Sequence, residues 1–394
     1  MHCNDPGAVP GWAAIALAVP LALLIATASA AQADEVQADE VQADEVQADE
    51  VQADEVVEEA VRLILRHHLL QPDPASLDRE SPAALLASLR RIDPAAQWWP
   101  PNAASANREW TGAGVVGIGA SVIDDGSRIV LVPQPGGALA SHGVSRPVRL
   151  TALRGYPVSR LDLEKVQEIL GDAAIDPVEV SAQDLAGGPP ISLSLKRGSY
   201  EPVSAELIGD YALPILRIHR FIKGVTLPQL RLALQPVLAA GQPIVLDLRY
   251  SAGGDLFEAL DSASLLLPSG LKLATLEDAA GRRTVFQSVD KRVDKEAAGK
   301  IFILVGQGTI SAAETFAAAL QNHAHARLIG TPTFGKCLAQ SAFPLIDGSV
   351  IVLSTGRLVN ASGWYCDGKG LAPDILVDRA EADDTAALLA RYVR

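Results

Sequence analysis

Cysteine and basic residues are both scarce in this chain of 394 residues. Its three cysteines, Cys3, Cys337 and Cys366, show no C-x-x-C spacing. The absence of this spacing excludes a zinc or redox site built from paired thiols. Three cysteines are also too few for a fold held together by a disulfide framework. Lys and Arg number 33 against 47 Asp and Glu, for a net charge of −14. A nucleic-acid-binding protein needs a concentrated basic surface to displace counterions from phosphates, so that class is excluded too.

Several catalytic and cofactor motifs are also missing. The sequence has no G-x-S-x-G, no H-E-x-x-H and no Walker loop. Residues 112–117 satisfy G-x-G-x-x-G, but a dinucleotide loop follows a strand and opens a helix, whereas here a strand follows. His323 and His325 lie two positions apart near a helix end, where they point in different directions and suit the helix dipole better than a metal ion.

The amino end is apolar from Trp12 to Ala26 except for Pro20, and the small-x-small pattern Ala28-Ser29-Ala30 follows. This pattern predicts an export signal, and therefore a protein of the bacterial periplasm or cell envelope. Residues 1–11 contain no Lys or Arg, unlike a usual signal peptide. An uncleaved membrane anchor is the alternative, because the segment up to Ala31 has about the twenty residues that span a bilayer. We favour cleavage because the run is short and mixed with Ala and Pro, and we expect membrane contact only if it is uncleaved.

A five-residue repeat fills residues 31–55. It holds five Asp and five Glu without Lys or Arg, so removing its −10 from the total of −14 leaves −4 for the rest of the chain. Because its Val residues recur every five positions, they step around a helix instead of lining one face. We interpret the repeat as a solvated spacer, with an acidic partner-binding tail as the alternative.

The next two regions differ in the secondary structure that their sequences predict. Apolar residues at helical spacing predict helices over Val56–Leu70 and Ser81–Arg91, and Gln97–Glu109 is expected to be a loop packed by its aromatic residues. Short β-like runs then predict a compact β-rich module with one helix at Leu161–Leu170. The predicted strands are Val115–Ile123, Arg128–Val132, Pro147–Leu153 and Ile191–Lys196.

The last half of the chain alternates strands and helices. Ile244–Leu248 and Ile301–Val305 are typical of buried strands, and such alternation predicts an α/β layer structure with a parallel sheet. The expected helices are Leu227–Ala240, Leu256–Leu267 and Ser311–His323. Near the end, Leu338–Leu345 and Val350–Arg357 flank an Asp-Gly turn and predict a hairpin.

Ser311, Lys336 and Gln340 are the candidate catalytic residues. Ser311 with Glu314 also fits a capping box, which starts a helix without any chemistry, and Lys336 taken alone fits a surface lysine. Together they indicate a catalytic site, because the strand that follows the helix can bring Lys336 back beside the start of that helix. A serine there has backbone N–H groups nearby to hold an oxyanion, and a partly buried lysine can act as a base. Gln340, on the same face of an extended segment as Lys336, can orient the amine.

Five segments in this order resemble the carboxyl-terminal processing peptidases, or tail-specific proteases. They are Ile244–Arg249 with Gly253-Gly254, Ser311–Glu314, Thr333–Lys336 with Gln340, Asp347–Ser349 and Gly370–Asp374. The resemblance covers about residues 115–378. It implies a mixed α/β fold: a ClpP/crotonase-like α/β catalytic core, an upstream β-rich PDZ-like domain and a helical N-terminal lead-in. The expected segments are 1–30 (signal or anchor), 31–55 (spacer), 56–110 (helical region), 111–198 (PDZ-like domain, with an extra segment at Asp172–Pro190) and 199–394 (peptidase domain).

The resemblance also implies roles. Ser311 would be the nucleophile of a serine endopeptidase, Lys336 its general base and Gln340 the partner that orients the base. The amides of Gly254 and Ala312 would form the oxyanion hole. The start of the PDZ-like domain, with Val116, Gly117, Ile118 and Gly119, would bind the carboxyl ends of protein or peptide substrates with flexible apolar tails. No metal and no cofactor is implied.

Two questions stay open at this stage. A catalytically inactive peptide- or lipophile-binding protein on the same fold is the alternative function, and a scaffold in which the PDZ-like module does all the work ranks below it. In an oxidising compartment Cys337 could form a disulfide with Cys366, or both could remain thiols.

Overall fold

The computed structural model describes residues 54–101, 115–161, 163–172, 174–201, 203–291, 293, 300–363 and 368–393. The predicted export signal, almost all of the acidic repeat, Cys3 and Cys366 lie outside the described residues. Within this part of the chain, no helix is both long enough and apolar enough to cross a membrane. The bounds of the five predicted segments stay a prediction.

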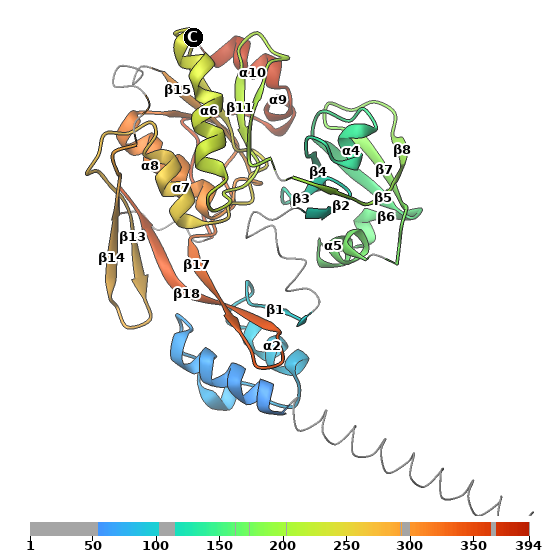
Figure 1. Ribbon diagram of the computed structural model, residues 1–394, viewed down its shortest axis with the longest axis vertical. Coiled ribbons are helices and arrows are strands. Elements are labelled where there is room, and N and C mark those ends of the chain that lie inside the picture. The colour runs from blue at the N-terminus through green and yellow to red at the C-terminus, as the bar shows by residue number, and fades with distance from the viewer. Residues whose placement is uncertain are drawn as a thin grey trace, which may run out of the picture. The chain divides into compact units, whose positions relative to one another are not determined.

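The N-terminal region is helical, as expected (Figure 1). A helix over residues 54–67 is followed by the short η1 (Pro74–Ser76) and by α2 (Pro82–Arg90). Ser81 caps α2 by accepting the N–H of Ala84, and Pro82 suits the first helical position because its missing N–H would have no partner there. The apolar faces of these helices form one cluster with β17 and β18, described below. Its buried members include Val61, Ile64, Leu85, Leu89, Ile351 and Leu353.

The prediction of a loop over Gln97–Glu109 is wrong for the first residues of this segment. Residues Gln97–Trp99 form the strand β1, which pairs antiparallel with Val350–Val352 of β18. The pairing partner lies some 250 positions further along the chain, so no local pattern could indicate it. Residues 102–110 are outside the described part of the chain.

The β-rich module has a sheet in the order β3-β4-β5-β7-β8, with β6 (Tyr156–Pro157) beside β5. Its strands are β3 (Ala120–Asp124), β4 (Ile129–Pro133), β5 (Val148–Leu153), β7 (Val178–Asp184) and β8 (Ile191–Leu195). A separate pair joins β2 (Val115–Gly117) to β9 (Gly198–Tyr200). The helical pieces are α4 (Ala138–Ser141), η3 (Val158–Arg160) and α5 (Leu163–Gly171).

The segment Asp172–Pro190, expected to be an addition to this module, contributes a strand to its sheet. It contains β7, which pairs antiparallel with both β5 and β8. Val178, Val180 and Ala182 alternate with more exposed residues and are buried, as one face of a strand requires.

The second half of the chain contains a six-stranded sheet in the order β10-β11-β12-β15-β16-β19. Its strands are β10 (Ala205–Ile208), β11 (Ile215–Ile218), β12 (Ile244–Asp247), β15 (Ile301–Val305), β16 (Arg327–Gly330) and β19 (Ile375–Leu376). All pairs except β10–β11 are parallel. Every residue of β11, β12 and β15 is buried, as in parallel strands covered on both faces. The predicted mixed α/β class is therefore confirmed.

Helices cover both faces of this sheet. Leu216, Leu246 and Ile303 share one core cluster with α6 (Thr226–Ala239), α7 (Leu256–Ala263) and α8 (Ala312–Ala324). Ile215, Val245 and Phe302 point into a second cluster with α9 (Arg379–Asp383) and α10 (Thr385–Tyr392). The helix predicted to reach Leu267 ends at Ala263, although Leu265, Leu266 and Leu267 stay in the core. The apolar pattern there therefore continues beyond the helix.

A second sheet carries the predicted hairpin. β17 (Leu338–Pro344) and β18 (Val350–Asn360) are antiparallel, and Gly348 in their turn has φ 82°, the positive value that an Asp-Gly turn supplies. β18 also pairs with β13 (Lys272–Asp278), which pairs with β14 (Arg283–Gln287). Because β17 begins two residues after Lys336, this sheet supports one side of the candidate site.

Candidate active site

Ser311 lies at the amino end of α8 with a strained backbone. Its φ of 57° and ψ of −118° place a residue with a side chain in a region that favours glycine. Strain of this kind persists only where neighbours enforce it, and it clusters at functional sites. The N–H of Ile310 donates to the carbonyl of Ser251 over 3.0 Å, and the Thr309 hydroxyl donates to the carbonyl of Leu248 over 2.8 Å. These bonds fix the turn that presents Ser311.

The glycine pair predicted to form the oxyanion loop lies directly beside Ser311. A Cβ placed on Gly253, whose φ is 85°, would be 2.5 Å from the carbonyl oxygen of Ile310 and 3.0 Å from the nitrogen of Ala312. Gly254 has φ 128° and packs equally tightly on Phe221. Among the described residues, the amides of Gly254 and Ala312 donate to no other group. Both are therefore available to a substrate oxygen.

Glu314 connects the serine to the lysine. One of its carboxylate oxygens accepts the backbone N–H of Ser311 and the backbone N–H of Lys336, each over 2.9 Å. The other accepts the N–H of Gly335 over 2.8 Å and the hydroxyl of Thr333. The nitrogens of Ser311 and Lys336 are therefore less than two hydrogen-bond lengths apart. Burial raises the pKa of Glu314, and its four hydrogen-bond donors oppose that rise.

The side chain of Lys336 is half-buried and meets Gln340. Its Nζ donates to Gln340 Oε1 over 2.7 Å, and Gln340 Nε2 donates to the carbonyl of Ala95 over 2.8 Å. Burial lowers the pKa of Lys336, the charge of Asp93 opposes this, and the charge of Arg220 adds to it. The net lowering moves Lys336 towards the uncharged form that a general base needs.

The remaining predicted residues lie elsewhere. Gly117 ends β2, and the carbonyls of Ile118 and Gly119 accept N–H groups from Leu139 and Gln134. Val116 belongs to the same strand. Ile118 and Gly119 form a bend between β2 and β3, and the binding role of these four residues stays a prediction.

Two further residues that the sequence singled out, Cys337 and His323, lie in different places. Cys337, next to Lys336, is disulfide-bonded. Its expected partner, Cys366, lies outside the described residues, so this pairing stays a prediction. His323 contacts the carbonyl of Lys272 over 2.8 Å at the far end of α8 from Ser311.

The β-rich module contacts both loops that surround Ser311. Ile123, Val130 and Val132 of the module form an apolar cluster with Tyr250, and Ala252 packs against it. A Cβ on Gly308, three positions before Ser311, would lie 2.9 Å from Ile123 Cγ2. The module therefore packs against the turn before Ser311 and against the segment that leads to Gly253.

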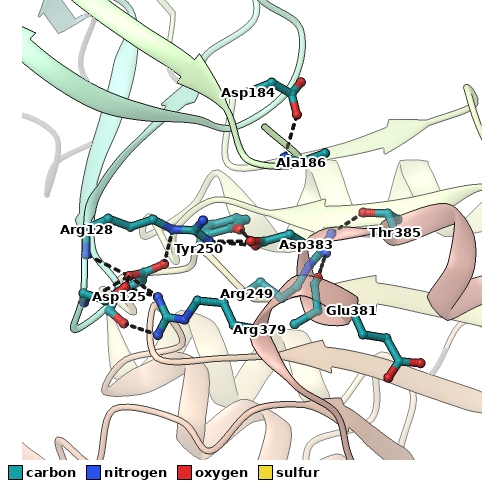
Figure 2. Close-up of polar contacts among 12 residues, drawn as sticks. Asp125, Arg128, Asp184, Ala186, Arg249, Tyr250, Arg379, Glu381, Asp383 and Thr385 are labelled. Carbon is teal, nitrogen blue, oxygen red and sulfur yellow. Dashed lines mark hydrogen bonds and ion pairs between the residues drawn. The ribbon is translucent and has the colours of Figure 1, made fainter. Parts of the chain in front are cut away.

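Ion pairs surround this apolar contact (Figure 2). Arg128 of the module donates to Asp125 over 2.8 Å and to Asp383 at the end of α9 over 2.7 Å. Arg379 donates to Asp125 over 2.7 Å. Tyr250 donates to Asp383 over 3.3 Å. Charged and apolar contacts thus join the module to the core beside the candidate site.

Sequence reasoning missed three contributors. Glu314 was visible only as a cap, because its bonds to Lys336 and Gly335 require tertiary structure. Asp93 and Ala95 gave no signal, since they approach Lys336 and Gln340 only after the N-terminal region packs on β18.

Comparisons with known proteins found matches to a peptidase family and to two named peptidases. Residues 214–377 match the model of peptidase family S41. The chain is 28% identical over 308 residues to a "Probable CtpA-like serine protease" of Staphylococcus aureus, covering 77% of this chain and 61% of that protein. It is 26% identical over 336 residues to a "C-terminal processing peptidase, chloroplastic" of Tetradesmus obliquus, covering 80% and 71%.

A solved structure, the photosystem II D1 C-terminal processing protease, shares the fold. Its TM-score is 0.61 at 23% identity, over 82% of this chain and 92% of that one. The chain spans less than two thirds of the length of the staphylococcal relative.

Proposed function

We propose that this chain, whose residues 214–377 match the model of peptidase family S41, is an exported serine endopeptidase that cleaves polypeptides recognised through their carboxyl-terminal tails. The observation that carries the proposal is the shared carboxylate of Glu314, which bonds the backbones of Ser311 and Lys336 while the amine of Lys336 meets Gln340. The names of the two relatives, a serine protease and a C-terminal processing peptidase, support the same reaction class.

The chemistry begins with the hydroxyl of Ser311. Its oxygen attacks the carbonyl carbon of the scissile peptide bond while neutral Lys336 takes the hydroxyl proton. The negative charge that develops on the carbonyl oxygen is stabilised by the amides of Gly254 and Ala312. The C–N bond then breaks, and the Lys336 ammonium returns the proton to the leaving amine. Water attacks the carbonyl carbon of the acyl-enzyme while Lys336 accepts a proton from it. The C–O bond to Ser311 then breaks, and the Lys336 ammonium returns the proton to the Ser311 oxygen as the acid product leaves.

An apolar side chain beside the site supports an apolar substrate tail. Phe334 is 49% exposed, and its N–H donates to the carbonyl of Thr309 over 3.1 Å. This bond keeps Phe334 next to the turn that presents Ser311. Burying such a ring under a substrate side chain would be favourable, because it removes apolar surface from water.

The decisive experiment is mass spectrometry of a digest. An unfolded protein with an apolar carboxyl-terminal tail is incubated with the wild type, with Ser311→Ala and with Lys336→Met. We expect defined internal fragments from the wild type and none from either variant. If the wild type binds the tail in a pull-down yet never cuts, the chain is a binding protein on a peptidase fold, and the proposed activity is wrong.

Export is tested separately. We expect amino-terminal sequencing of the protein recovered from the cell envelope to show a start after Ala30, or after a second small-x-small pattern, Ala31-Gln32-Ala33. An intact amino terminus in the membrane fraction would instead indicate an anchor. Intact mass before and after reduction and alkylation of the same sample reports the expected bridge between Cys337 and Cys366.

A further inference from the structure

The turn at residues 93–96 of the N-terminal region reaches the candidate catalytic residues. Gln340 Nε2 donates to the carbonyl of Ala95 across 245 positions of sequence. A carbonyl oxygen only accepts hydrogen bonds, so the amide nitrogen of Gln340 must face Ala95. Its oxygen therefore faces Lys336, 2.7 Å from Nζ. If the amide nitrogen of Gln340 faced Lys336 instead, it would donate a hydrogen bond to the lone pair of Nζ. Lys336 needs that lone pair to accept the proton of Ser311.

The same turn holds a buried carboxylate. Asp93 is 2% exposed, and its oxygens accept bonds from His68 Nε2 over 3.2 Å and from the N–H and hydroxyl of Ser354, each over 3.0 Å. The N–H of Ala95 also donates to it over 3.2 Å. The turn is thus tied both to the helical region and to β18.

His68 contacts Asp93 with one ring nitrogen and the backbone with the other. Its Nδ1 lies 3.1 Å from the backbone N–H of Leu70, which can only donate, so Nδ1 accepts and carries no proton. The ring proton is then on Nε2 and points to Asp93. Burial raises the pKa of Asp93, but the hydrogen bonds from His68 and Ser354 outweigh this and leave the pKa lowered.

We propose that the turn 93–96 is a positioning element of the catalytic site. The carbonyl of Ala95 fixes the Gln340 amide as an acceptor for Lys336, and Asp93, held by His68 and Ser354, stabilises the ammonium that forms on Lys336. This inference rests on the proposed role of Lys336 as the base. On this proposal, the helical N-terminal region helps to position the catalytic residues.

The charges around Lys336 act in opposite directions. Asp93 favours the ammonium, Arg220 and burial disfavour it, and Glu314 faces the backbone N–H of Lys336, not its amine. The groups packed on Asp93 are His68 and Ser354. Removing the charge of Asp93 should therefore lower the pKa of Lys336, and a merely structural role would leave that pKa unchanged.

The first test titrates Lys336 directly. Lysine side chains are labelled with carbon-13 and followed by NMR in the Ser311→Ala background, with the Lys336 signal assigned by its loss in Lys336→Met. We expect Asp93→Asn to shift the titration of Lys336 to lower pH. The matched control is Glu80→Gln, which removes one charge at an exposed position of the same region. A Lys336 titration identical in Asp93→Asn and Glu80→Gln would overturn the role of Asp93.

The titration of Lys336 is measured without any cleavage, so it tests the role of Asp93 separately from the proposed peptidase activity. A shifted titration with no cleavage by the wild type would contradict the peptidase while leaving the electrostatic contact in place. With an active wild type, we expect Asp93→Asn to move the acid limb of the kcat/KM profile to lower pH and to lower kcat with KM unchanged.

The second variant tests Ala95 and does not alter the buried carboxylate. Gln340→Glu keeps an oxygen for Lys336 but has no N–H to donate to the Ala95 carbonyl, and Gln340 is only half-buried, so we expect folding to persist. We expect kcat on the high-pH plateau to fall at least tenfold. A plateau equal to that of the wild type would mean that only the oxygen matters, and the role of Ala95 would be wrong.

Discussion

The carboxylate of Glu314 accepts the backbone N–H of Lys336 over 2.9 Å, although 22 positions separate the two residues. The same oxygen accepts the N–H of Ser311 over 2.9 Å. A residue in the first turn of α8 thus holds the lysine segment against the serine segment. Through these two bonds, a helix cap also supports the proposed catalytic pair.

Replacing Glu314 by Gln should damage both stability and activity. An amide has one accepting oxygen where the carboxylate has two, so its nitrogen would face N–H groups that cannot accept from it. We expect the free energy of unfolding to fall by about 1–3 kcal/mol and kcat to fall on the order of 10²-fold through misplacement of Lys336. Thermal unfolding and steady-state kinetics check these values, with Glu80→Gln as control. Unchanged kcat in a folded variant would contradict the role.

The pH dependence of cleavage should follow Lys336. Burial lowers its pKa, so the neutral base appears below the ordinary pH range of lysine, and kcat/KM should rise as pH increases through that lowered value. Lys336→Arg should be inactive at every pH, because a guanidinium stays protonated. The measurement is a pH–rate profile on one peptide. An acid limb at the usual lysine pKa, or activity in Lys336→Arg, would count against the base.

Gly253→Ala should disable the site by closing the space beside Ser311. The new Cβ would lie 2.5 Å from the carbonyl oxygen of Ile310, at a backbone φ of 85°. Gly241→Ala is the matched control, because its φ is 61° but nothing lies within 4 Å of the new atom. We expect the control to cost about 1–2 kcal/mol of stability from backbone strain alone and to keep its activity. Equal activity of the two variants would show that the close approach is unimportant.

The ion pair between Arg128 and Asp383 should matter more than surface pairs do. Their side chains are 14% and 9% exposed, and breaking a buried pair by removing one partner typically costs about 3–5 kcal/mol. We expect Arg128→Ala to approach this loss in chemical denaturation. Arg79→Ala, which removes a pair exposed by 43% and 48%, should cost less than about 1 kcal/mol. A double-mutant cycle with Asp383→Ala isolates the coupling, and a coupling of zero would mean that the two groups act independently.

Acid should weaken the contact between the module and the core. Burial raises the pKa of Asp125, but its bonds to Arg128 and Arg379 outweigh this and leave the pKa below its ordinary value of 3.8. A lowered folded-state pKa stabilises the fold above the unfolded-state value, and this contribution is lost as pH falls through the folded-state pKa. The stability difference between wild type and Asp125→Asn should therefore be largest near neutral pH and shrink below about pH 4. A difference that stays constant down to pH 2 would contradict this.

Local patterns were enough for much of the fold. Unbroken apolar runs predicted the buried strands at Ile244 and Ile301, because parallel strands covered on both faces have no polar side. The Asp-Gly turn predicted the hairpin after Lys336, because a positive φ is needed there. Where pairing is distant the patterns failed, as at Gln97–Trp99, whose partner strand Val350–Val352 lies far along the chain.

The candidate site divides in the same way. The amino-acid sequence by itself determined which groups could perform the chemistry: a serine at a helix start, a lysine before a strand, and a glutamine four positions later. Only the tertiary structure decided what holds them, namely Glu314 between the two segments and Ala95 behind Gln340. The reason is physical. Chemical identity and spacing along a helix or strand are local properties, whereas a hydrogen bond between segments far apart in sequence exists only once the core has packed and brought them together.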